Sequence, residues 1–176
     1  MRRRPAQTDA RIGGRKIAPE LVIGNVSGDD DVVAQTKGPG LREWIDITQE
    51  RIDTFAAATG DNQWIHVDPV RAMRESPYRA TIAHGFLTLS LYPLLRGLVD
   101  SATPLFPGVT RVINYGLDKL RFPNAVKVGS RVRARCTLLK VEEVAGGLQL
   151  TEQYTVEIEG ETTPACVAEA IMRAYF

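Results

Sequence analysis

Cysteine is scarce in this sequence, and its placement excludes a cysteine-based site. The two cysteines, Cys136 and Cys166, belong to no CxxC pair, the usual sign of a redox or zinc motif. Each lies in a segment with a strand-like pattern. We therefore expect both to be reduced, buried residues of a cytoplasmic protein, and a disulfide between them is the alternative.

Long hydrophobic runs and a marked net charge are also missing. Polar residues interrupt even the apolar segment from Ala83 to Val99, so no run approaches the length that crosses a bilayer. Residues 1–16, MRRRPAQTDARIGGRK, are basic but lack the apolar stretch of a secretory signal. The net charge of +1 gives no electrostatic reason to expect nucleic acid or an anionic membrane as a partner.

The length and composition indicate one domain preceded by an arm. A chain of 176 residues that is 44% apolar suffices for one well-buried core but not for two ordinary domains. Residues 1–40 are rich in glycine, proline and acidic residues without a sustained period, so we expect a weakly structured N-terminal arm. Within it, residues 21–26 could form a short docking strand. Residues 41–176 then form the domain.

The first part of the domain predicts one strand followed by helices. Residues 42–48, REWIDIT, alternate as a strand does. Apolar residues then recur at helical spacing, with Thr48 as the expected N-cap and Gly60 as the C-terminal stop. Asp68-Pro69 predicts the start of a short helix. The run after His84-Gly85 is apolar on nearly every face, which predicts a buried helix.

The second part of the domain predicts a β meander. Four segments have strand patterns, and tight turns around 143–148 and 159–161 separate the last three. These segments are residues 110–122, 131–144, 148–159 and 163–176. In the second of them, apolar residues alternate with three arginines, which indicates a sheet with one wet face and argues against a nucleic-acid platform. The order of elements gives an α+β fold in which an antiparallel sheet could wrap a long apolar helix.

The chain also has few histidines, and both lie in one short region. His66 stands five residues after Asp61 in GDNQWIHVDPVRA, and His84 opens AHGFLTLSLYPLLRGLV. A carboxylate and an imidazole can hold one water between them and have their pKa values set apart by burial. Because the segment after Gly60 is irregular, the chain can bend so that both side chains converge. In the alternative reading, Asp61 caps a turn and His66 is a hydrogen-bonded core residue.

These motifs resemble the signature of the MaoC-like dehydratases, also called R-specific or type 2 enoyl-CoA hydratases. The resemblance rests on GDNQWIHVDPVRA followed by SPYRATIAHGFLTLSL, and the later INYGLDKLRFPNAVKVGSRV and PACVAEAIMR resemble strands of the nodulation protein N-like branch. It covers residues 41–176. It implies a hotdog fold, in which a five-stranded antiparallel sheet wraps around a long buried helix.

The resemblance implies a lyase of fatty acid metabolism. Its expected activity interconverts (2E)-enoyl-CoA and (3R)-3-hydroxyacyl-CoA, with a coenzyme A or acyl-carrier-protein thioester as substrate and no cofactor. A homodimer with a shared ten-stranded sheet is expected, and neither nucleic acid nor a membrane is an expected partner. An acyl-CoA thioesterase or a non-catalytic acyl-thioester binder on the same fold are the alternatives.

The family pattern also implies roles for individual residues. Asp61 and His66 would be the catalytic pair, without the sequence deciding which takes the proton from water. The backbone N–H of Gly85 would bind the thioester oxygen, with His84 beside it. Gln63 and Trp64 stand where the family commonly has Asn and Pro, and we expect them to contribute to substrate binding.

Two other interpretations of charged residues in this region remain. His66, Asp68 and His84 imitate an iron-binding facial triad, but Asp68 is better used as the cap before Pro69, so no metal is expected. Arg79, Lys119 and Arg121 could meet the phosphates of coenzyme A, although each alone is more simply a solvated charge.

Overall fold

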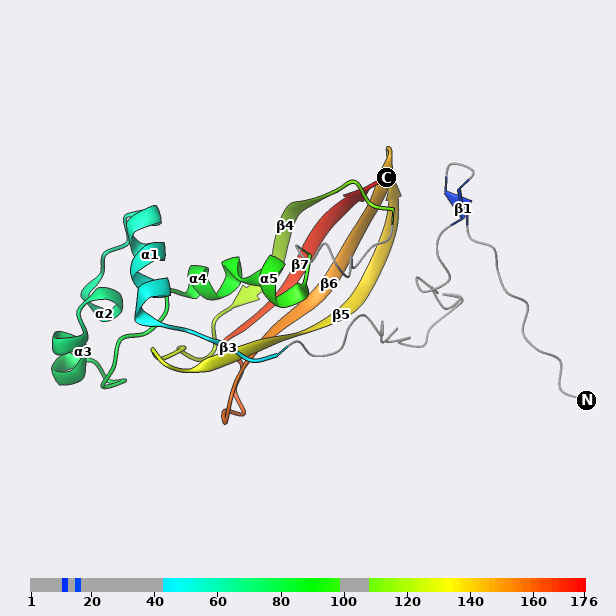
Figure 1. The fold of residues 1–176 in the computed structure, drawn as a ribbon. Coiled ribbons are helices and arrows are strands. Elements are labelled where there is room, and N and C mark those ends of the chain that lie inside the picture. The colour runs from blue at the N-terminus through cyan, green and yellow to red at the C-terminus, as the bar shows by residue number, and fades with distance from the viewer. Residues whose placement is uncertain (1–10, 13–14, 17–42, 99–107) are drawn as a thin grey trace, which may run out of the picture.

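The computed structural model describes residues 11–12, 15–16, 43–98 and 108–176. Its largest element is a curved five-stranded antiparallel sheet in the order β3-β5-β6-β7-β4 (Figure 1). The strands are β3 (Ile45–Asp46), β4 (Arg111–Arg121), β5 (Arg131–Val144), β6 (Gly147–Ile158) and β7 (Cys166–Tyr175). The predicted strands from residue 110 onward are thus confirmed, whereas the predicted strand over 42–48 pairs at only two residues.

The inner and outer faces of the sheet follow the alternation in the sequence. Every second residue of β6 and β7 is buried, and the register pairs Leu150 with Met172 and Tyr154 with Ala168 on the inner face. On β5, Val132 and Ala134 point into the core. The predicted face of arginines faces outward, where it forms ion pairs with Glu157 of β6 and with Glu159, which follows that strand. The sheet therefore has one apolar face to cover.

Two short helices cover the concave face. These are α4 (Gly85–Ser90) and α5 (Tyr92–Arg96), and the sheet curves around them in Figure 1. The sequence predicts a single long helix here, but the structure divides it at Leu91. Pro93 has no N–H to donate and cannot continue the backbone hydrogen-bond ladder, which explains the division. The helices bury Leu87, Leu91 and Leu95 against the sheet but leave Phe86 exposed.

Three further helices form the end of the molecule opposite the β5–β6 hairpin (Figure 1). They are α1 (Gln49–Thr59), α2 (Trp64–Val67) and α3 (Pro69–Glu75). The predicted caps of α1 are confirmed: the Thr48 hydroxyl accepts a hydrogen bond from the N–H of Arg51, and Gly60 ends the helix in a left-handed conformation. The predicted start of α3 is confirmed as well, with Asp68 as its N-cap and Pro69 as its first residue.

Few residues of the predicted arm belong to the described part of the chain. Strands β1 (Arg11–Ile12) and β2 (Arg15–Lys16) pair with each other, and the docking strand predicted for residues 21–26 lies outside the described residues. Among the described residues, no helix is long and apolar enough to span a membrane.

Both cysteines are free, as predicted, and Cys166 is buried, whereas Cys136 is only partly buried. Burial raises the pKa of the Cys136 thiol to about 12 and that of Cys166 to about 11. The two thiols therefore stay protonated at neutral pH and are not nucleophiles.

Candidate active site

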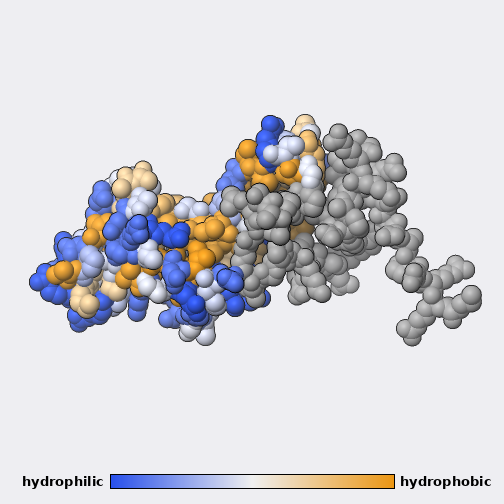
Figure 2. Space-filling view, in the orientation of Figure 1, coloured by the Kyte–Doolittle hydropathy of each residue, from blue (hydrophilic) through white to orange (hydrophobic). Residues whose placement is uncertain are grey.

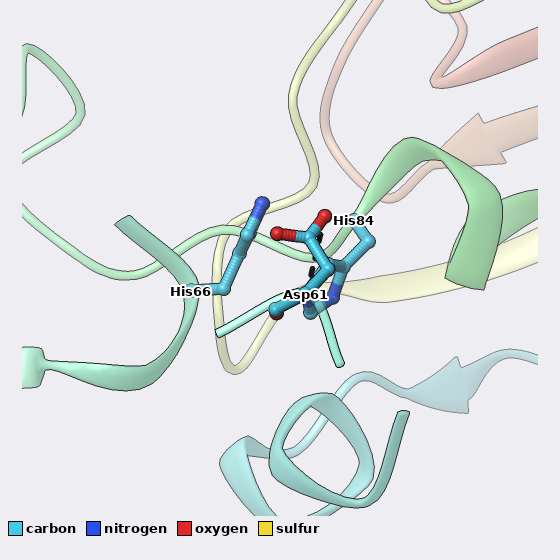
Figure 3. Close-up of side chains that lie close together, drawn as sticks. All are labelled: Asp61, His66 and His84. Atoms are coloured by element: carbon cyan, nitrogen blue, oxygen red, sulfur yellow. Dashed lines mark hydrogen bonds and ion pairs between the residues drawn. The ribbon is translucent and has the colours of Figure 1, made fainter. Parts of the chain in front are cut away.

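A glycine turn brings Asp61 back toward α2. Gly60 has a φ of 79°, a left-handed conformation that lets the chain reverse directly after α1. Asp61 follows the turn, and His66 lies within the short helix α2 that comes next. The ligand atoms of Asp61, His66 and His84 all lie within 4.8 Å of one another (Figure 3). The convergence expected for Asp61 and His66 is therefore present in the structure.

His66 is held in one tautomer by a backbone carbonyl. Its side chain is buried, and Nδ1 lies 2.6 Å from the carbonyl oxygen of Ile82. Because a carbonyl only accepts, Nδ1 carries the proton and donates it, which leaves the lone pair of the neutral ring on Nε2. Burial lowers the pKa of His66 and the neighbouring His84 lowers it further, whereas the Ile82 hydrogen bond and Asp61 oppose the shift. At neutral pH the ring is therefore neutral.

This lowered pKa predicts a pH-dependent stability. The unfolded chain takes up the proton near the ordinary value of 6.5, whereas folded His66 takes it up only at a lower pH. The free energy of unfolding should therefore fall as the pH drops through 6.5 toward the folded pKa. Urea unfolding at about pH 7 and about pH 5 measures this, and His66→Gln should show a smaller decline. An identical decline in the two proteins would contradict the assignment.

His84 contacts both members of the pair. Its Nε2 lies 2.9 Å from the backbone carbonyl oxygen of Asp61, so Nε2 carries a proton and donates it. Its ring stacks on His66 with a centroid distance of 3.7 Å, and Phe55 packs on it at 5.1 Å. The other ring nitrogen, Nδ1, is buried and has no hydrogen-bond partner among the residues that the structure describes. His84 thus holds the turn that carries Asp61.

The carboxylate of Asp61 faces the open side of the cluster. Its side chain is 52% exposed, whereas that of His84 is 3% exposed. The nearest distance between a carboxylate oxygen of Asp61 and His84 Nε2 is 4.0 Å. The cluster therefore consists of one solvent-accessible carboxylate beside two buried rings, an arrangement that can bind a water molecule at its surface.

Gly85 lies beside this cluster as the first residue of α4. A Cβ at this position would lie 2.9 Å from the ring of Phe122, so the packing of that ring requires glycine here. As the first helical residue, Gly85 has no acceptor for its N–H within the helix. Because α4 has only six residues, the helix dipole contributes less to an anion here than a long helix would.

Gln63 and Trp64 lie at the start of α2. The side chain of Gln63 is exposed and makes no cap hydrogen bond to the helix, but its backbone carbonyl accepts from the N–H of His66 at 2.9 Å. The Trp64 ring packs under the guanidinium of Arg71, 4.4 Å away. The observed contacts of these two residues are thus with α2 and α3.

The three clustered residues meet the distance requirement of a metal site but not its orientation requirement. His66 Nδ1 and His84 Nε2 are each bonded to a backbone carbonyl. The two rings are tilted by only 25° in a stack, so the lone pairs in their planes do not converge on one point. Asp68 accepts a hydrogen bond from the N–H of Arg71 at 2.9 Å as the cap of α3. The arrangement suits acid–base chemistry better than metal binding.

Sequence reasoning missed the residues that support His66. Gln49 and Thr81 both contribute hydrogen bonds near it, although they lie 17 and 15 positions away in the chain. No local motif marks either one. The basic candidates make other contacts: Arg79 donates to carbonyl oxygens at the end of α3, and Lys119 pairs with Glu169 at 2.6 Å.

Comparisons with known proteins place the chain in a family. The family model described as "MaoC like domain" matches residues 32–160. The chain is 53% identical to 3-hydroxyacyl-thioester dehydratase Z of Mycobacterium tuberculosis over 135 residues, which cover 76% of this chain and 86% of the relative. It is 50% identical to nodulation protein N of Rhizobium leguminosarum bv. viciae over 133 residues, covering 75% and 81%.

A solved structure supports the fold assignment. The (R)-hydratase from A. caviae involved in PHA biosynthesis is 25% identical, has a TM-score of 0.58, and is matched over 74% of this chain and 89% of its own. The predicted hotdog fold is confirmed by such neighbours and by the curved five-stranded sheet. This chain belongs to the MaoC-like domain family.

Proposed function

We propose that this protein is a hydratase/dehydratase that interconverts (2E)-enoyl-CoA and (3R)-3-hydroxyacyl-CoA. The observation that carries the proposal is the convergence of Asp61 and His66, from separate segments, next to Gly85. Family membership supports the reaction class, because the relatives include a 3-hydroxyacyl-thioester dehydratase and an (R)-hydratase. The lowered pKa of His66 keeps the ring neutral at neutral pH, so its Nε2 is available to accept a proton.

The chemistry follows from the state of each group. A water bound between the Asp61 carboxylate and His66 Nε2 would lose a proton to the pair while its oxygen bonds to C3 of the enoyl group. The C2–C3 π electrons then move toward the thioester, and its oxygen becomes negative. Gly85 N–H would hydrogen-bond that oxygen, and C2 would then receive the proton, which completes the addition of one water. Dehydration is the reverse.

The remaining candidates would act at the approach to the pair. His84 would keep the Asp61 turn in place through its hydrogen bond to the backbone carbonyl. Gln63 and Trp64, which lie at the start of α2, would contact the substrate from the α2 side. The thioester handle, coenzyme A or an acyl-carrier protein, would reach the pair from the exposed side of Asp61.

The proposal is tested by following both the enoyl double bond and the thioester bond in one reaction. Crotonyl-CoA is added to the purified protein, and the absorbance of the conjugated enoyl thioester is recorded beside a free-thiol assay. Loss of the band without thiol release is the expected result. Thiol release would instead identify a thioesterase, and a silent assay with direct binding of the thioester would identify a non-catalytic binder.

We further propose that the protein is a homodimer in which β4 pairs with β4 of a second copy. In the described sheet, β4 is an edge strand (Figure 1). It exposes Ile113, Tyr115 and Leu117 by 47%, 56% and 43%. Long edge strands with exposed apolar side chains favour pairing with another strand. Phe86, next to Gly85, packs edge to face on Phe122 and is 65% exposed, so the interface would adjoin the site.

The surface of the molecule fits this arrangement. Figure 2 shows hydrophobic residues gathered over the middle of the molecule, near α4, whereas the end formed by α1–α3 is more hydrophilic. The same α4 exposes Phe86. A second copy that covered β4 and this region would remove apolar surface from water near each active site.

A charged substitution on β4 should separate the subunits. Leu117→Lys places a charge among exposed apolar residues of the edge strand, where it would have to be buried on pairing. We expect the dimer dissociation constant to rise at least about tenfold, measured by sedimentation velocity over a concentration series. Leu139→Lys, at the 48% exposed Leu139 of β5, is the matched control and should leave the dimer intact. An unchanged dimer of the β4 variant would place the interface elsewhere.

A further inference from the structure

The backbone of His66 depends on a side chain from another helix. Helix α2 has only four residues, so its carbonyl groups find no N–H donor within the helix. The carbonyl oxygen of His66 instead accepts a hydrogen bond from Nε2 of Gln49 at 2.7 Å. Gln49 is the first residue of α1, directly after the Thr48 cap. This bond fixes the point from which the His66 side chain projects.

The other end of the same amide is held by a buried hydroxyl. Oε1 of Gln49 accepts from the hydroxyl of Thr81 at 2.5 Å, and Thr81 is fully buried. Asp53 adds a second acceptor for Nε2 at 2.8 Å. With its donor and its acceptor both engaged, the Gln49 amide has one orientation. It connects the start of α1 to α2 and to the segment that contains Thr81.

The segment that Thr81 begins also holds the imidazole. Ile82, the next residue, accepts from His66 Nδ1 and donates its N–H to the carbonyl of Ile65 at 3.0 Å. The backbone of His66 and its ring are therefore both tied to residues 81–82, one through Gln49 and one directly. These contacts form a closed set in which a shift of one member moves the others.

We propose that Gln49 is a positioning residue that, with Thr81, fixes the orientation and the tautomer of His66. It touches no reacting atom and acts through His66. The contacts described above support the effect of Gln49 on the geometry of His66. The effect of Gln49 on catalysis rests on the proposed hydratase function. Two charged or titratable groups, Asp61 and His84, face the same ring, and Asp53 lies beside the Gln49 amide.

The position of Gln49 requires a side chain that both donates and accepts a hydrogen bond, as an amide does. Methionine has a similar length but neither a donor nor a strong acceptor, so Gln49→Met would leave the His66 carbonyl and the Thr81 hydroxyl without these partners. Gln49→Glu would keep an acceptor for Thr81 but turn a carboxylate oxygen toward the His66 carbonyl oxygen. Thr81→Val removes the hydroxyl donor at nearly unchanged volume. The three variants therefore remove, respectively, both amide hydrogen bonds, the amide donor alone, and the hydroxyl that donates to the amide.

The test uses the fact that the chain has only two histidines. Nitrogen NMR of the imidazole rings reports the tautomer and the titration of each, and His66→Gln assigns the signals. In the wild type we expect neutral His66 protonated at Nδ1. In Gln49→Met and Thr81→Val we expect mixed tautomers and a shifted titration of His66. We also expect kcat for crotonyl-CoA hydration to be about tenfold lower with little change in KM, the size typical of lost supporting hydrogen bonds.

A matched control lies at the other end of the sheet. The Gln149 amide donates to Glu142 at 3.3 Å and accepts from Arg173 at 3.0 Å, so Gln149→Met also removes two amide hydrogen bonds. It should leave the His66 signals and kcat unchanged. Gln49 variants that unfold cooperatively but show wild-type His66 signals would overturn the proposal. If the variants change the His66 signals but the wild type hydrates no thioester, the proposal about Gln49 is upheld and the hydratase function is rejected. Thr81→Ser keeps the hydroxyl donor and should therefore retain the wild-type signals.

Discussion

Replacing either member of the central pair should abolish most hydration activity. His66→Gln removes the Nε2 lone pair and Asp61→Asn removes the carboxylate charge, while both keep side chains of similar size. General acid–base groups contribute about 10²–10⁴-fold to a rate, so we expect kcat to fall by that factor in each variant. The double variant should be little worse than either single one, because the two groups would act on one water. Initial rates with crotonyl-CoA measure this.

The neighbouring residue Asn62 supplies the control. Its exposed side chain donates to the carbonyl of Gly60 at 3.3 Å, so Asn62→Ala changes the same turn while leaving the Asp61 and His66 side chains in place. We expect kcat within about twofold of the wild type. Circular dichroism of all variants confirms that the fold is retained. Activity of His66→Gln equal to that of Asn62→Ala would show that His66 is a structural residue of the core.

Removing one partner of the buried ion pair beneath α5 should strongly destabilise the protein. Arg96 of α5 donates to both carboxylate oxygens of Glu152 of β6, from Nε at 2.7 Å and from Nη2 at 2.5 Å, and Tyr92 donates to the same carboxylate at 3.1 Å. Glu152 is 1% exposed. Arg96→Met leaves a buried carboxylate with its charge uncompensated, and we expect the free energy of unfolding to fall by about 3–5 kcal/mol.

A double variant separates two contributions to the free energy of unfolding: the cost of leaving one buried charge unpaired and the net stabilisation by the ion pair. Arg96→Met combined with Glu152→Leu removes both charges and should recover most of the lost stability, since apolar replacements of buried pairs are often neutral. The exposed pair of Arg131 and Glu159 is the control, because water screens it and Arg131→Gln should cost much less stability than Arg96→Met. Urea unfolding measures all four proteins. Equal losses for Arg96→Met and Arg131→Gln would contradict the account.

Local features of the fold could be predicted because their causes are local. A cap, a stop or a turn depends on residues that are neighbours in sequence, so Thr48, Gly60 and Asp68 mark the helices that the structure shows. The strands of the meander follow from alternation, because one face of the sheet is buried. The division of the central helix could also have been predicted from Pro93, but continuous apolar character masked it.

Long-range polar contacts could not be predicted in this way. Glu152 lies among the alternating positions of β6 that are otherwise apolar, and its partner Arg96 is 56 positions away on α5. Gln49 likewise looks like an ordinary polar residue at a helix start until the fold brings it to His66. The motif around Asp61 and His66 placed the candidate site, whereas the residues that orient it appear only when distant segments are packed together.

Isotope-labelled water tests the central claim most directly. The protein is incubated with crotonyl-CoA in water enriched in oxygen-18, and the products are analysed by mass spectrometry. The account predicts an intact coenzyme A thioester that carries one labelled oxygen on C3, formed by the wild type and not above background by His66→Gln. Labelled oxygen in a free carboxylic acid, released together with free coenzyme A, would contradict it and show that water attacks the thioester carbonyl.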